Sequence, residues 1–220
     1  MSALSNLSIK LRLTILSAFA LTLLIILSIV SVNALSNAAK SLKTVYHDRL
    51  IPTGQLGRIE LAVQTIQTEL LLSAQHNPSH PLRSSHQHPV DQHLNVVDGA
   101  VSLIKKDWSA YLSTHLTAEE KQLSDTVDAQ LERMLTQGVV PALMALRQAD
   151  FAAANQILLT TLRPEAGTLA GTLEQILELQ SAIAEQEYQN AETSYQNTLI
   201  IAAITTLVAL TVLLLMSWSI

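Results

Sequence analysis

Uncharged, mostly apolar residues are concentrated at the two ends of the chain. Residues 13–32 and 199–220 contain no charged side chain, and about twenty apolar residues suffice to cross the hydrocarbon core of a membrane. We therefore predict transmembrane helices at both places. A cleaved signal peptide is the alternative for the first segment, because small residues follow it. Its apolar stretch is longer than the roughly 7–15 residues usual for such a peptide, which favours a membrane helix.

The basic residues near the N-terminus predict how these helices are oriented. Lys10 and Arg12 lie just before the first segment, and basic residues are enriched on the cytoplasmic side of membrane helices. Two lysines beyond the segment weaken this bias without reversing it. We expect residues 1–12 to be a cytoplasmic stub and residues 33–198 to lie outside the cytoplasm.

Between the two segments, apolar residues recur at alternating steps of three and four, which is the pattern of a heptad seam. Prolines and polar connections divide this pattern into four stretches. Four long helices with short connections predict an all-α fold, an antiparallel up-down four-helix bundle continuous with the two transmembrane helices. The main seam residues are Leu56, Ile59, Val63, Ile66 and Leu70; Leu94, Val97, Ile104, Trp108 and Tyr111; Leu123, Val127 and Met134; and Leu162, Ala166, Leu169, Leu173 and Ile176.

A few residues interrupt or delimit these helices. Arg49 and Pro52 interrupt the first seam, and a proline inside a helix removes a donor and clashes with the preceding turn, so we expect a kink or local break there. Gln180 is a polar interruption of the last seam. The segment Thr117-Ala118-Glu119-Glu120 has the pattern of a capping box, and Asp150 is placed to cap the fourth helix.

Composition excludes several other classes of protein. The chain has six glycines, six prolines and no cysteine in 220 residues, so it lacks the turns of a sandwich or barrel and the cysteines of a disulfide scaffold. A formal net charge of −5, without a basic stripe, argues against a nucleic-acid partner. No nucleophile-base set or phosphate-binding glycine loop has usable spacing. We expect no enzymatic activity and no cofactor.

Histidines cluster in one connection. Five of the seven lie in or beside the loop between the first and second helices, and imidazole is a common metal ligand. A surface metal site is therefore conceivable. A solvated loop is the alternative that we favour, because cysteine and a helical His-x-x-x-His pair are both missing. The five are His76, His80, His86, His88 and His93.

Three segments of the chain carry a resemblance to a known family. They are Tyr46-His47-Asp48-Arg49-Leu50-Ile51-Pro52-Thr53-Gly54-Gln55-Leu56-Gly57-Arg58-Ile59, Leu116-Thr117-Ala118-Glu119-Glu120-Lys121 and Pro141-Ala142-Leu143-Met144-Ala145-Leu146. They resemble the ligand-binding region of methyl-accepting chemotaxis receptors of the aspartate-receptor type. Together with the two apolar segments, the resemblance covers nearly the whole chain. It implies a chemoreceptor sensor domain in the periplasm, held in the bacterial inner membrane. It also implies a homodimer, and we expect self-association through the first helix, whose long seam is partly surplus to the core of one bundle.

The resemblance transfers the family's ligand site only in part. Receptors for aspartate carry three arginines on the first helix, and only Arg58 matches, since Val63 and Gln67 stand at the other two positions. Aspartate is therefore a poor candidate, and a small organic or aromatic carboxylate with more apolar surface is expected. The residues expected to bind it are Arg58, Trp108, Arg133, Thr161 and Arg163.

Other outputs fit the same input domain. The bundle could also feed a membrane histidine kinase or a cyclic-dinucleotide enzyme, or it could be a structural membrane protein that senses nothing. The sequence ends at Ile220, directly after the second apolar segment, whereas the resemblance implies a linker, methylation helices and a kinase-contacting tip beyond it. We expect a fragment of a longer receptor or a truncated one.

Overall fold

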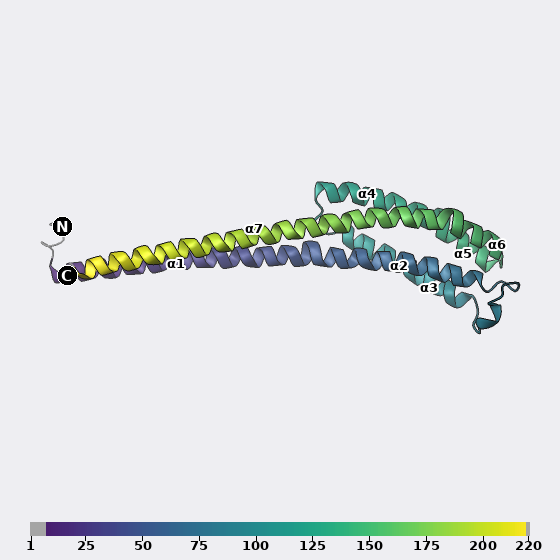
Figure 1. Cartoon of the computed structure of the whole chain (residues 1–220), viewed down its shortest axis with the longest axis horizontal. Coiled ribbons are helices and arrows are strands. Elements are labelled where there is room, and N and C mark those ends of the chain that lie inside the picture. Colours follow the sequence, from purple (N-terminus) through teal and green to yellow (C-terminus); the bar gives the residue numbers. More distant parts are fainter. Residues whose placement is uncertain (1–7, 219–220) are drawn as a thin grey trace. The chain divides into compact units, whose positions relative to one another are not determined.

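The computed structural model describes residues 8–218, which form two compact units (Figure 1). The bundle unit is Val45–Ala184. The apolar unit contains the described residues before Val45 and after Ala184. The fold is all-α, as predicted.

The apolar unit consists of α1 (Ile9–Thr44) and the C-terminal part of α7 (Arg163–Trp218). Each contains an 18-residue window apolar enough to cross a membrane, with mean hydropathy 2.7 and 2.6, and none of either window is buried within the protein. The hydroxyls of Thr22 and Thr211 donate to carbonyls four residues earlier, at 2.8 Å in both cases. These two hydroxyls are thus satisfied within their own helices, an arrangement that a lipid environment would favour.

The bundle unit is an antiparallel four-helix bundle in which three of the helices contain a π-helical stretch. The first helix is η1 (Val45–Leu50) and α2 (Ile51–Ala74), and the second is α3 (Asp91–Leu112). The third is α4 (Ala118–Arg133), η3 (Met134–Val139) and α5 (Val140–Arg147). The fourth is α6 (Phe151–Ile157), η4 (Leu158–Leu162) and the beginning of α7. A short 3-10 turn, η2 (Arg83–Ser85), lies in the connection between α2 and α3.

The core of the bundle unit follows the predicted seams. All the seam residues named above are buried except Leu123, which is half-buried against the core. Because the seam of α2 is buried in the core of a single chain, it leaves no free surface for a second copy. The expectation that this seam has surplus surface is therefore wrong, whereas self-association through the first helix stays a prediction and would need another face of that helix.

Each π-helical stretch ends two residues before a proline. The stretches end at Leu50, Val139 and Leu162, and the prolines are Pro52, Pro141 and Pro164. Proline has no N–H to donate and its ring crowds the carbonyl four residues earlier, and a locally widened turn relieves that crowding. The break expected around Pro52 therefore occurs as a π-helical stretch.

Two of these stretches meet at a glycine. A Cβ atom on Gly138 of η3 would lie 3.2 Å from the Cα of Leu162 in η4. That distance is too short for the backbones to tolerate easily. Glycine at this position lets the third and fourth helices approach closely.

The helix starts agree with the capping residues in the sequence. The Thr117 hydroxyl accepts from the Glu120 N–H and the Glu120 carboxylate accepts from the Thr117 N–H, which completes the predicted capping box. Asp150 caps α6 through the N–H of Ala153. Just before it, Ala149 has a positive φ of 57°, a conformation that reverses the chain sharply between the third and fourth helices.

Candidate functional site

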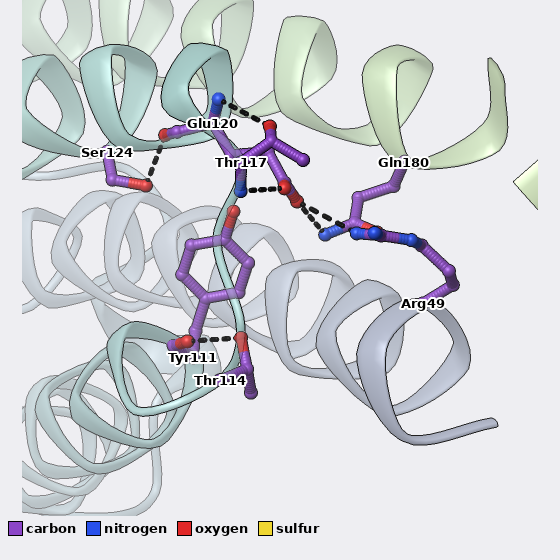
Figure 2. A network of polar contacts seen from close by, with 7 residues as sticks. All are labelled: Arg49, Tyr111, Thr114, Thr117, Glu120, Ser124 and Gln180. Carbon is purple, nitrogen blue, oxygen red and sulfur yellow. Dashed lines mark hydrogen bonds and ion pairs between the residues drawn. The ribbon is translucent and has the colours of Figure 1, made fainter. Parts of the chain in front are cut away.

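A buried polar network joins three helices at the end of the bundle unit where its first helix begins (Figure 2). Nη1 of Arg49, in η1, lies 3.4 Å from Oε1 of Glu120 in α4 and 3.3 Å from Oε1 of Gln180 in α7. The Gln180 amide also donates to Glu120. Arg49 is 5% exposed, Gln180 is 1% exposed and Glu120 is fully buried. Both polar interruptions of the predicted seams therefore contact the same carboxylate.

Glu120 is held in this position by its own helix. One carboxylate oxygen, Oε2, accepts from the Thr117 N–H at 2.7 Å in the capping box, which leaves Oε1 to meet Arg49 and Gln180. The Ser124 hydroxyl donates to the Glu120 carbonyl at 2.7 Å. The sequence revealed the cap, but it showed Arg49 only as an interruption of the first seam near Pro52.

Tyr111 lies against this network from α3, as Figure 2 shows. Burial raises the pKa of its phenol, an effect that nearby Ser124 and Gln180 partly offset. The tyrosine therefore stays neutral at physiological pH. The polar contacts thus join three helices, and Tyr111 adds the fourth by lying beside them. Breaking a buried ion pair such as that of Arg49 and Glu120 leaves an uncompensated charge.

Two surface hollows lie along α2, and each contains an arginine of the predicted ligand site. The first, about 420 Å³ in volume, is lined by Arg163 at the start of α7, by the polar residues Gln64, Gln67 and Thr68, and by the leucines Leu71, Leu158 and Leu159. The second, about 470 Å³, is lined by Arg58, Ser102, Leu103, Lys106 and Asp107.

The two arginines differ in their partners. Nε of Arg58 lies 2.7 Å from Oδ2 of Asp107 in α3, and this hydrogen bond raises the pKa of Arg58. Within the described part of the chain, Arg163 is exposed and has no ion-pair partner. Arg163 is thus the more available cation.

The remaining predicted residues lie elsewhere. Trp108 is buried, stacks on Tyr111 with ring centroids 5.2 Å apart, and donates to Asp128 at 3.0 Å. Arg133 pairs with Glu165 of α7 at 3.3 Å. Thr161 is half-buried in η4 and does not line the hollow that contains Arg163. The five residues do not converge on one hollow within a single chain, so their role in ligand binding stays a prediction.

Four of the five loop histidines come together at the other end of α2. His76, His86, His88 and His93 place their ligand atoms within 4.8 Å of one another. Burial, followed by the neighbouring imidazoles and Arg83, lowers the pKa of His76 to about 4. Desolvation, followed by the neighbouring imidazoles and Arg83, also lowers the pKa of His86. The loop is therefore less solvated than the sequence suggested.

An antiparallel helical bundle whose first and last helices continue into apolar helices is the architecture of a membrane-anchored sensory protein. The chain belongs to such a family, because the family model described as a four helix bundle sensory module for signal transduction matches residues 6–195. It is a chemoreceptor-type sensor module. No curated protein and no solved structure is similar enough to add a second comparison.

Proposed function

We propose that this protein detects a small solute outside the cytoplasm and transmits its binding along α7. Residues 13–32 and 199–220 span the bacterial inner membrane in this proposal, residues 33–198 lie in the periplasm, and residues 1–12 lie in the cytoplasm. The observation that carries it is the continuity of α7. This helix starts at Arg163 in the hollow and runs without a break for 56 residues through the second apolar segment.

Topology is tested with reporter fusions. Alkaline phosphatase, which is active only outside the cytoplasm, should be active when fused after Glu120 and inactive when fused after Ile220. A cytoplasmic reporter such as green fluorescent protein should give the opposite pattern. Equal cytoplasmic signals at both positions would refute the proposed topology.

The ligand that best fits the hollow at Arg163 is a small organic carboxylate with an apolar part. A guanidinium group pairs with a carboxylate through two parallel hydrogen bonds. Gln67 and Thr68 line the same hollow and supply donors for further oxygens, while Leu71 and Leu159 supply apolar surface. Aromatic, hydroxylated and di- or tricarboxylic acids share these features.

Arg58 is the second candidate for this role. Lys106 lines the same hollow and adds positive charge, but Asp107 already occupies the Arg58 guanidinium and would repel a second carboxylate. We therefore place the ligand at Arg163 first. Mutation of each arginine distinguishes the two hollows, because only the variant at the ligand site should lose affinity.

The separating experiment is calorimetry on the full chain in detergent, after a thermal-shift screen against organic acids, amino acids and aromatic acids. Arg163→Ala should weaken binding of a carboxylate hit by at least about tenfold, because a lost charged hydrogen bond costs about 1.5–3 kcal/mol. Arg58→Ala is the matched control and should change the affinity less than about twofold. The reverse result would assign the ligand to Arg58, and no effect from either variant would refute both sites.

For the homodimer, we infer that the exposed face of α2 is the interface. Its exposed positions repeat at steps of four and three, and a small or apolar residue stands at most of them, which is a second heptad seam. A Cβ atom on Gly57 would contact nothing within 4 Å, so another helix could approach closely there. The positions are Leu50, Gly54, Gly57, Leu61, Gln64, Thr68 and Leu71.

Cysteine crosslinking tests this interface, and the natural chain has no cysteine to interfere. Cysteines at Leu50, Gly57, Leu61 and Leu71 should crosslink between copies in membranes. Cysteines at exposed Asp125 and Glu132 of α4 are the controls and should not. Crosslinking of both sets alike, or of neither, would count against the interface.

A further inference from the structure

The connection between α2 and α3 gathers four imidazole rings from three places in the sequence. His76 follows the end of α2, His86 and His88 lie in the connection, and His93 lies in the first turn of α3. All six pairs of rings have centroids between 4.4 and 5.7 Å apart. The rings form a compact cluster in which every ring neighbours every other.

Two of these rings are buried with a ring nitrogen that lacks a partner. His76 is 5% exposed and His93 is 8% exposed. Across the described residues, Nε2 of both finds no hydrogen-bond partner. A buried polar atom left unpaired costs about 1–3 kcal/mol, and such atoms in a folded protein call for an explanation.

In three of the four rings, one nitrogen lies within hydrogen-bond distance of an oxygen. Nδ1 of His93 lies 2.6 Å from a Glu69 carboxylate oxygen, Nε2 of His86 lies 3.1 Å from the Gln75 amide oxygen, and Nδ1 of His88 lies 3.2 Å from the Pro89 carbonyl. Each oxygen can accept a hydrogen bond from the N–H of its ring. In a neutral imidazole the opposite nitrogen then carries the lone pair that can bind a metal ion. Oxygens in this position orient and polarise the histidine ligands of metal ions.

We propose that His76, His86, His88 and His93 bind one divalent transition metal ion and that Zn²⁺ fits them best. Four neutral imidazoles without a thiolate suit zinc, nickel, cobalt or copper rather than calcium or magnesium. Zinc favours four ligands in a tetrahedron, and four mutually neighbouring rings approximate that arrangement better than they approximate a plane.

The distances permit such a site after small ring rotations. Zinc binds imidazole nitrogen at about 2.0–2.1 Å, which places tetrahedral ligands about 3.4 Å apart, and the ligand atoms here lie within 4.8 Å of one another. Glu69 supplies negative charge next to His93, whereas Arg83 places positive charge near His76 and His86. A bound ion would tie the end of α2 to the start of α3.

The first test is metal titration of the full chain in detergent, freed of any affinity tag and of metal by a chelator. Calorimetry should give one Zn²⁺ per chain, and Mg²⁺ should not bind. Co²⁺ in place of Zn²⁺ should give the intense visible absorption of a tetrahedral site. Weak Zn²⁺ binding with variable stoichiometry, or octahedral Co²⁺ spectra, would refute the proposal.

Substitutions locate the site. His88→Gln and His86→Gln change half-buried rings that the core does not need, and each should weaken Zn²⁺ binding by at least tenfold. His115→Gln and His47→Gln, which lie outside the cluster, are the controls and should leave the affinity unchanged. Equal affinity in all four variants would mean that the cluster does not bind the metal.

A change at Glu69 separates a metal site from mere packing of rings. Glu69→Gln keeps the shape but removes the charge that orients His93, and an altered outer partner of a histidine ligand typically weakens metal affinity about 10–100-fold. Circular dichroism should show the same helicity as the parent chain. An unchanged zinc affinity in this variant would refute the role of Glu69 as the outer partner of a metal-bound His93.

Discussion

The two ends of the bundle unit treat buried polar side chains in different ways. At the end where the first helix begins, Arg49, Glu120 and Gln180 contact one another. At the other end, His76 and His93 bury ring nitrogens that meet no partner among the described residues. The first end holds its charges with groups from its own helices, although the neutral hydroxyl of Tyr111 there also finds no hydrogen-bond partner among the described residues. The second end has unpaired ligand atoms and is therefore the end where an external ion can add stability.

A buried polar group with an opposite charge beside it indicates a structural role, whereas a cluster of buried groups of one kind indicates a ligand. Arg49 and Glu120 are both buried, and each brings the opposite charge that the other needs in a medium of low polarity. Clustered imidazoles cannot bring opposite charge to one another, since protonating one disfavours protonating its neighbours. A cation with several open coordination positions can accept a lone pair from all four rings at once.

The largest effect should come from Glu120→Ala. This change leaves Arg49 uncompensated and also removes part of the cap of α4, so the free energy of unfolding should fall by about 3–5 kcal/mol. Urea unfolding of the full chain in detergent measures it through Trp108 fluorescence, in a Trp218→Phe background. Glu119→Ala, an exposed neighbour in the same helical turn, is the control. A loss below about 1 kcal/mol would show that the network adds little to stability.

A smaller effect should appear at the histidine end when the pH is lowered in the presence of a chelator. The folded pKa of His76 is about 4, below the unfolded value of about 6.5, so the unfolded chain takes up the proton first. Above pH 6.5 His76 is neutral in both states and the free energy of unfolding is at its full value. It falls as the pH is lowered from 6.5 toward 4, a range in which mainly the unfolded chain binds the proton. The loss should be roughly 1–3 kcal/mol.

His76→Gln should reduce this pH dependence, with a remainder from His86, whose pKa is also lowered by desolvation, and His115→Gln should retain it in full. His86, His88, His93 and Arg83 all face His76 and contribute to its low pKa. The measurement is the urea midpoint at pH 7.5, 6, 5 and 4.5. An identical decline in the two variants would trace the effect to other groups.

The smallest effect should come from an exposed ion pair in the same unit. Arg147 and Asp98 lie 3.0 Å apart with side chains 54% and 51% exposed. Water screens such a pair, so Arg147→Ala should change the free energy of unfolding by less than about 1 kcal/mol. The same urea assay measures it. A loss as large as that of Glu120→Ala would show that burial does not explain the difference between the two pairs.

Much of the fold could be predicted from the sequence because it depends on periodicity along a single helix. Heptad spacing identified the buried face of each bundle helix, and uncharged length identified the two apolar helices. Caps are local as well, so the roles of Thr117 and Asp150 followed from their neighbours in the chain. These features need only a few consecutive residues to be recognised.

The candidate sites followed from the sequence only in part, because they depend on which helices lie side by side. The sequence indicated that Arg49 and Gln180 interrupt their seams, but not that both meet Glu120. It listed Arg58 and Arg163 in one site, whereas the structure places them in separate hollows. The pairing of Arg58 with Asp107 could not be read from either helix alone.

Spacing along the chain was enough to locate the helices, their buried faces and the two apolar segments, and to suggest the family. The partners of the charged residues and the gathering of four histidines from positions 76 to 93 came from the packing of the helices against one another. The two kinds of feature differ in how far apart along the chain their residues lie. Helix formation and seam burial follow from spacing along the chain, whereas ion pairs and metal sites need side chains of different segments within a few ångströms, which packing alone arranges.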